Sequence, residues 1–69
     1  MPLTLLKEGE PASVRKVGGK EDIRQFLAKL GFVTGASVTV VSATEGNLIV
    51  NVKDSRIAIG KEMACRIIV

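Results

Sequence analysis

The sequence predicts a small, mainly β domain: a barrel of about five short strands with one amphipathic α-helix between strands 1 and 2 and a short helical turn before the last strand. Three observations support this prediction. Residues 21–30 carry apolar side chains at helical spacing. Valine and isoleucine, which favour strands, crowd into the second half of the chain, where apolar and polar residues alternate. A chain of 69 residues has room for one core, so residues 1–69 are expected to form a single domain.

The helix is predicted over Glu21–Leu30. Its apolar residues recur at the i, i+3, i+4 and i+7 positions of one helix face: Ile23, Phe26, Leu27 and Leu30. Glu21 and Asp22 fall in the first turn, where the positive end of the helix dipole favours carboxylates. Gly31 is expected just after the helix, because glycine adopts the left-handed conformation of a helix end at the lowest cost.

The first three strands are predicted from alternation and from the turns between them. The first strand is expected from Ala12 to Val17, with an imperfect alternation that suggests a bulge. The second runs from Ala36 to Ser42, and a hairpin turn at Glu45–Asn47 leads to a return strand over residues 47–53. The side chains expected to face the core from these two strands are Ala36, Val38, Val40, Leu48, Val50 and Val52.

The end of the chain repeats the pattern on a shorter scale. A tight turn at residues 53–55 precedes a strand over 56–59, with Ile57 and Ile59 directed inward. Lys61–Ala64 is expected to form the helical turn, and residues 66–69 the last strand. The N-terminal leucines at positions 3, 5 and 6 are expected to fold back as a lid over one end of the core. This arrangement fits an SH3-like barrel best, since closure removes exposed sheet edges.

Charge and composition argue against several function classes. The net charge is +3, the basic residues are scattered, and Phe26 and Phe32 are the only aromatic residues. Nucleic-acid binders usually combine a dense basic stripe with stacking aromatics, so no nucleic-acid partner is expected. No apolar run approaches the roughly 20 residues that span a bilayer, and no secretion signal is visible. One unpaired cysteine fits a reducing compartment, so a cytoplasmic protein is predicted.

The sequence offers little for catalysis or metal binding. Histidine is absent, and the close acidic pairs are Glu8 with Glu10 and Glu21 with Asp22. The second pair is better explained by the helix dipole. Cys65 has no histidine to activate it and is expected to be a small buried residue. We therefore predict a protein that is not an enzyme, with no catalytic residues, no cofactor and no metal site of its own.

The candidate partner-binding residues are apolar side chains expected on solvent-exposed faces, together with charged side chains next to them. Val41 and Ile49 point outward by alternation on adjacent strands, where they are either cross-strand neighbours in an exposed patch or covered by the leucines or the helix. Phe32 either packs at the end of the helix or serves as a partial surface anchor. Lys53 and Arg56 would supply a polar rim.

Taken in order, these residues resemble the FeoA family. The resemblance lies in the order and spacing of core and turn positions over nearly the whole chain: Phe26, Leu27, Leu30, Gly31, Phe32, Gly35, Val38, Val40, Gly46, Leu48, Val50, Val52, Arg56, Ile57, Ala58, Ile59, Ala64, Ile67 and Val69. Gln25 stands where members commonly carry a basic residue, and Thr34 where proline is frequent. The resemblance implies a non-enzymatic accessory protein of bacterial ferrous iron transport with an SH3-like fold.

The resemblance also implies a partner. It would be the membrane transporter FeoB, contacted through its cytoplasmic GTP-binding domain, with no insertion into the membrane by this chain. Weak self-association stays open. The alternative is a FeoA-like C-terminal domain, or a stand-alone partner, of a metal-dependent transcription repressor, since a closely related domain occurs there.

Overall fold

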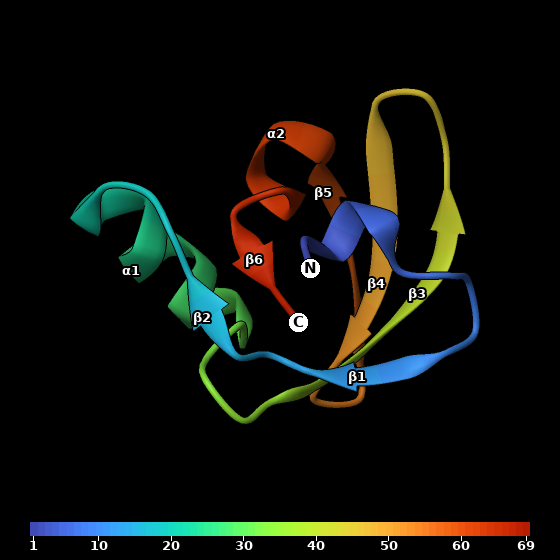
Figure 1. The fold of residues 1–69 in the computed structure, drawn as a ribbon, viewed down its shortest axis with the longest axis horizontal. Coiled ribbons are helices and arrows are strands. Elements are labelled where there is room, and N and C mark those ends of the chain that lie inside the picture. Colours follow the sequence, from blue (N-terminus) through green and yellow to red (C-terminus); the bar gives the residue numbers. More distant parts are fainter.

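The computed structural model describes residues 1–69 and divides the strands between two small sheets that share one core (Figure 1). The four-stranded sheet has the order β1-β3-β4-β5, and the two-stranded sheet pairs β2 with β6. All pairs are antiparallel. The strands are β1 (Pro11–Ser13), β2 (Lys16–Val17), β3 (Ser37–Ala43), β4 (Asn47–Val52), β5 (Ser55–Gly60) and β6 (Ile67–Ile68). The helices are η1 (Leu3–Leu5), α1 (Glu21–Leu30) and α2 (Lys61–Ala64).

The helix α1 has the predicted bounds and ends as expected. Gly31 follows it with φ 110°, and its N–H donates to the Ala28 carbonyl at 3.0 Å. The Phe32 N–H donates to the Leu27 carbonyl, also at 3.0 Å. Together these bonds form a Schellman motif, in which the residues at its two ends meet through apolar side chains. Here Phe32 and Leu27 are both buried, so the end of the helix is fastened to the core.

The prediction for the apolar helix face is wrong at one residue. Leu27 is buried and Ile23 and Leu30 pack against the core, but Phe26 is 49% exposed. Successive helical residues are about 100° apart, which places Phe26 on the solvent side of Leu27 at the edge of the stripe. The core therefore takes its aromatic group from Phe32, beyond the helix.

The predicted first strand, Ala12–Val17, is two strands with a corner between them. The Val14 N–H donates to the Ala36 carbonyl at 2.9 Å, whereas the Arg15 N–H donates to the Ile68 carbonyl at 2.7 Å. The backbone partners therefore change from the larger sheet to the smaller one within two residues. Val14 is buried at this corner, which explains why the alternation is broken there. Six strands result, where about five were expected from the pattern of turns.

The core is aliphatic apart from one phenylalanine and contains no buried polar residue. All the side chains predicted to face inward from β3 and β4 are buried or pack against it. The N-terminal lid is confirmed for Leu3, which is fully buried, and for Leu6, but Leu5 is 66% exposed. The buried set is Leu3, Val14, Leu27, Phe32, Val38, Val40, Leu48, Val50, Val52, Ile59, Ala64 and Ile67.

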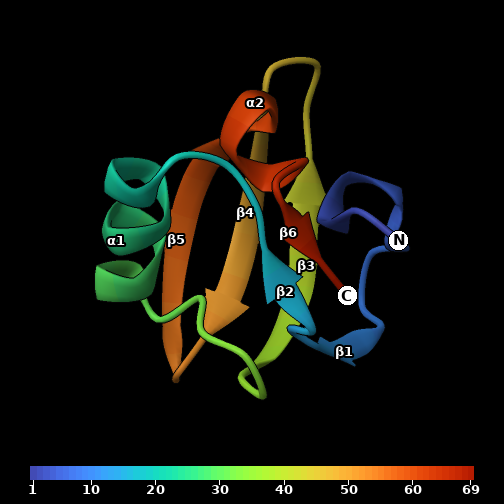
Figure 2. The ribbon, with the colours of Figure 1, turned by 60° about the vertical axis from the view of Figure 1, so that its left-hand side comes forward.

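The arrangement leaves two solvent-facing surfaces on opposite sides of the core (Figure 2). One is the outer face of β3, β4 and β5. The other lies over β2 and β6, next to η1, whose first turn is joined to β6 by a bridge between Pro2 and Ile68. None of the helices is long and apolar enough to cross a membrane.

Candidate functional site

The outer face of the larger sheet brings together most of the residues singled out in the sequence. Val40, Val50 and Ile57 pair across the three strands and face the core. Because side chains alternate along a strand, the residues next to them in the sequence face outward. Asn51 pairs with Thr39 on one side and with Arg56 on the other, which forms a polar row across three strands. We call Thr39, Val41, Ile49, Asn51 and Arg56 the outer sheet face.

The apolar part of this face is built on a bulge. The register of β3 and β4 shifts between Val40 and Ser42, so Ile49 pairs with Ser42 and Val41 is the extra residue beside it. Val41 and Ile49 are therefore neighbours across the bulge rather than a regular cross-strand pair. Both are half-buried, and neither belongs to the core cluster or packs against it. They form a small apolar patch next to the polar row.

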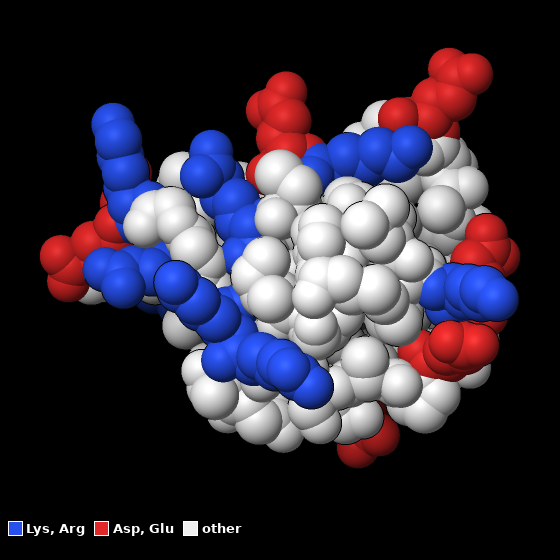
Figure 3. Space-filling view, viewed as in Figure 1, with Lys and Arg blue, Asp and Glu red and all other residues white.

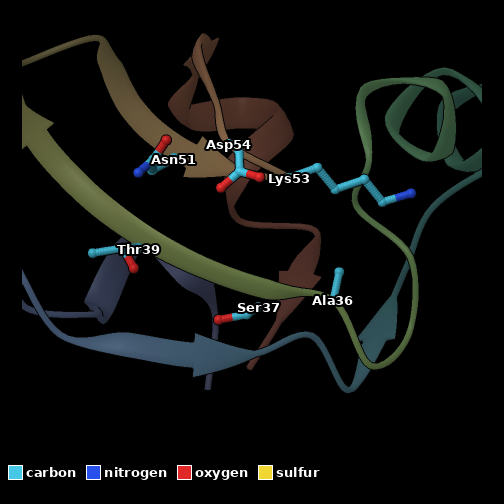
Figure 4. A pocket seen from close by; sticks show the side chains of 6 residues that line it. All are labelled: Ala36, Ser37, Thr39, Asn51, Lys53 and Asp54. Atoms are coloured by element: carbon cyan, nitrogen blue, oxygen red, sulfur yellow. The ribbon is translucent and has the colours of Figure 1, made fainter.

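A groove of about 300 Å³ lies beside the polar row. Its walls come from the start of β3, from β4 and from the turn after β4 (Figure 4). The lining residues are Ala36, Ser37, Thr39, Asn51, Lys53 and Asp54. Only Ala36 is apolar, so the groove offers hydroxyl, amide and carboxylate groups for hydrogen bonding.

The ammonium group of Lys53 points away from the other groove residues (Figure 4). Figure 4 shows its side chain extending away from Asp54 toward the end of α1. A Cβ atom added to Gly31 would lie 3.4 Å from the Cδ atom of Lys53, so the lysine stem covers that glycine. This places a cation at the carboxyl end of α1, where the helix dipole favours it. Lys53 therefore has a structural role as well as a place at the rim of the candidate site.

The turn between β4 and β5 has an unusual backbone. Lys53 and Asp54 are its two central residues, between the paired Val52 and Ser55, and have φ angles of 49° and 63°. Positive φ at both positions is the geometry of a type I′ turn, for which asparagine and glycine are the preferred residues. Such backbone strain often accompanies a functional site.

Replacing Asp54 by glycine should relieve this strain. We expect Asp54→Gly to raise the free energy of unfolding by about 0.5–1 kcal/mol. Glycine removes the energetic cost of the left-handed backbone conformation. It also makes the unfolded chain more flexible, which offsets part of that stabilisation. Urea unfolding followed by circular dichroism measures the change. The control is Glu45→Gly in the other hairpin, where no positive φ needs relief. A destabilised Asp54→Gly protein would show that the aspartate contributes more than its backbone costs.

Phe32 lies outside the candidate site. Its side chain is 1% exposed and belongs to the core cluster, so it is unavailable to a partner in the folded domain. Of the two interpretations of this residue, packing at the end of the helix is the one that the structure supports. The surface-anchor interpretation is wrong because the Schellman motif turns Phe32 inward onto Leu27.

The other polar groups singled out in the sequence make local hydrogen bonds. Asp22 accepts a hydrogen bond from the Ile23 N–H at 2.9 Å and Glu21 one from Gln25 at 3.3 Å, which fits their expected role at the helix start. Cys65 is exposed, contrary to the prediction, because it ends α2 while Ala64 takes the buried position. Its thiol donates to the Glu62 carbonyl at 3.0 Å. No group of three or more His, Cys, Asp or Glu side chains is arranged to hold a metal ion.

The sequence analysis did not identify the polar residues of the candidate site. Thr39, Asn51 and Asp54 were not singled out, although alternation places the first two outward on neighbouring strands. Their cross-strand pairing depends on the register of β3 and β4, which the bulge at Val41 shifts by one residue. The groove also needs the curvature of β3, which local alternation does not report.

Comparison with known proteins identifies relatives over the whole length of the chain. The family model described as the FeoA domain matches residues 1–69. A protein of Methanocaldococcus jannaschii named "Putative Fe(2+) transport protein A" is 35% identical over 68 residues, which cover 99% of this chain and 83% of that protein.

Solved structures agree with this match. A crystal structure of an iron uptake regulatory protein, FeoA, has a TM-score of 0.90 at 31% identity and covers 97% of this chain and 91% of its own. Stenotrophomonas maltophilia FeoA, crystallised with zinc and described as a prokaryotic SH3 domain protein, has a TM-score of 0.85 at 30% identity, covering 99% and 87%. The fold is therefore SH3-like, as predicted.

One neighbour comes from a different class of protein. A manganese-dependent transcriptional repressor has a TM-score of 0.88, with 97% of this chain matched to 39% of the repressor. Its identity of 16% shows a shared fold and nothing more.

Proposed function

The chain belongs to the FeoA family, and from this premise we propose that it is a non-enzymatic accessory protein of ferrous iron transport that docks on the cytoplasmic GTP-binding domain of a FeoB-type transporter and modulates uptake. In this proposal the chain works in the cytoplasm and binds through the outer sheet face. The domain would act as a rigid body whose binding favours one conformation of the transporter, since a ligand shifts an equilibrium only by its differential affinity.

The observation that carries the proposal is the composition of the outer sheet face. Val41 and Ile49 are half-buried apolar side chains that the core does not use. Asn51 and Arg56 lie beside them on the same face, and the groove adjoins it. An apolar centre with a polar rim is the usual anatomy of a protein interface. The two Val/Ile side chains are expected to supply affinity, and Arg56 to supply electrostatic steering.

A titration of the isotope-labelled protein with the transporter's GTP-binding domain tests the proposal. We expect amide shifts concentrated on Thr39, Ile49, Asn51 and Arg56, with a size that depends on the nucleotide bound. Ile49→Ala should weaken binding by roughly fivefold to tenfold, the loss typical of a truncated interface side chain. Arg56→Ala should mainly lower the association rate, and more so at low salt.

The matched control is Lys16→Ala, on the far side of the core. It removes one positive charge as Arg56→Ala does, but from β2, and should leave docking unchanged. The absence of shifts with every nucleotide would overturn the proposal. Shifts that gather away from β3, β4 and β5 would overturn the choice of surface.

A second candidate function is a partner or C-terminal domain of a metal-dependent transcription repressor. The observation in its favour is the fold shared with the manganese-dependent repressor. The same labelled protein, titrated with such a repressor in place of the transporter domain, distinguishes the two. Binding to the repressor alone would favour the second candidate.

A further inference from the structure

The smaller sheet presents a basic surface to solvent. Val17 and Ile67 pair with each other and face the core, so Lys16, Arg66 and Ile68 face outward. The Arg66 side chain lies over the turn before α1, where a Cβ added to Gly19 would be 3.0 Å from its Nη1 atom. Figure 3 shows Lys and Arg side chains gathered in a band over β2 and the neighbouring part of α1, with acidic side chains at the outer edges of the view.

An apolar area adjoins this basic band, and paired backbone segments connect the two. Lys16 pairs with Ile68, and Ile68 bridges to Pro2, so these three residues lie in a row with about 5 Å between neighbours. Ile68 is half-buried and does not belong to the core. Figure 3 shows an uncharged surface over η1 and β6 beside the band of basic side chains.

Leu5 is the most exposed large apolar side chain, at 66%. It is held in a fixed place, because its N–H donates to the Pro2 carbonyl at 3.0 Å and Leu3 in the same turn is fully buried. The leucine therefore projects from a rigid turn that begins at Pro2, the end of the row opposite Lys16. An exposed leucine beside lysine and arginine is the composition of surfaces that lie in the headgroup region of a bilayer.

We propose that this surface, formed by Leu5, Lys16 and Arg66 and called the lipid face, binds membranes that carry anionic phospholipid headgroups. Two observations favour a bilayer over an acidic peptide. The basic and apolar groups lie side by side on a convex surface (Figure 3). The groove is lined by β3, β4 and the turn after β4, on the other side of the core (Figure 4). Charge complementarity supplies most of the attraction, since the chain carries a net charge of +3 and its bound face is basic.

The proposal goes beyond docking on a transporter and does not depend on it. The outer sheet face and the lipid face point away from each other, so the domain can contact a membrane and a protein at once. Membrane binding would hold the protein near any membrane-embedded partner and raise its effective concentration there.

Vesicle sedimentation tests the lipid face in the absence of any partner protein. We expect the protein to bind vesicles of phosphatidylcholine with about one third phosphatidylglycerol, to ignore pure phosphatidylcholine, and to dissociate as salt is raised. Lys16→Ala and Arg66→Ala should each weaken binding about fivefold, the contribution of one basic residue near an anionic surface. Leu5→Ala should weaken it by a similar factor at every salt concentration.

Arg56→Ala is the matched control, since it removes the same charge from the opposite surface and should leave vesicle binding unchanged. Thermal unfolding of each variant verifies that the exposed substitutions leave the fold intact. Equal binding to neutral and anionic vesicles would overturn the proposal, as would equal effects of Lys16→Ala and Arg56→Ala. Amide shifts of the lipid face with an acidic protein domain but not with vesicles would assign the surface to a protein instead.

The titration with the transporter domain and the vesicle sedimentation test the two proposals separately. Lys16→Ala is expected to affect vesicles but not transporter docking, and Arg56→Ala the reverse. Loss of one result therefore leaves the other standing.

Discussion

Phe32→Ala is expected to abolish or nearly abolish folding. Replacing a fully buried phenylalanine by alanine typically costs about 3–5 kcal/mol, from lost transfer energy and from the cavity left behind. Phe32 is the only aromatic side chain in the core and also holds the end of α1 against it. A domain of this size has a thin margin of stability, so the loss is comparable to the whole free energy of unfolding. Collapse of amide chemical-shift dispersion and a featureless thermal melt would be the readout.

The chain provides its own control for this substitution. Phe26→Ala removes the same atoms from a side chain that is half exposed on α1. We expect it to lower the free energy of unfolding by only about 1 kcal/mol, because half of the ring is already in water and alanine is the better helix former. If Phe26→Ala proved as damaging as Phe32→Ala, the assignment of the core would be wrong.

The two phenylalanines show which features of the fold can be predicted from the sequence and which cannot. The helix and its glycine end are local features, because the spacing of Ile23, Leu27 and Leu30 and the conformational freedom of Gly31 act within a few residues. The same spacing also places Phe26 on the apolar face of the helix and so predicts, wrongly, that it is buried. Which edge of a stripe meets the core depends on what packs against it, and here Phe32 fills that space instead.

The corner at Val14 has the same kind of cause. Broken alternation between residues 12 and 17 is visible in the sequence and suggests a bulge. The structure instead divides the segment between two sheets, because its hydrogen-bond partners are Ala36 on one side and Ile68 on the other. Both partners are far away along the chain, so a local pattern distinguishes a bulge from a corner poorly.

For the candidate site, alternation predicted orientation well and contacts less well. Arg56 is exposed, and Val41 and Ile49 are half-buried residues that lie outside the core cluster. The bulge at Val41 changes its partner, and the polar row through Thr39 and Asn51 appears only once the register of three strands is known. Binding by this face stays a prediction that the titration decides.

Gly31→Ala is expected to be the most damaging glycine substitution in the chain. Two costs add there. A residue with a side chain is strained at φ 110°, by about 1–2 kcal/mol. The new Cβ would also lie 3.3 Å from the Cγ2 atom of Val52, a core side chain with no room to retreat. Crowding of this kind costs about 1 kcal/mol or more, so a total of roughly 2–3 kcal/mol is expected in urea unfolding.

Two further glycines separate these costs. Gly35 has φ 91° but nothing within 4 Å of an added Cβ, so Gly35→Ala should show the backbone cost alone. Gly46 has neither a positive φ nor a neighbour within 4 Å, so Gly46→Ala should be neutral or stabilise slightly through the unfolded state. The expected order of destabilisation is therefore Gly31, Gly35, Gly46. Equal losses at Gly31 and Gly35 would mean that Val52 and Lys53 yield to the new methyl group, and that the end of α1 is held less tightly to the β4–β5 turn than its contacts imply.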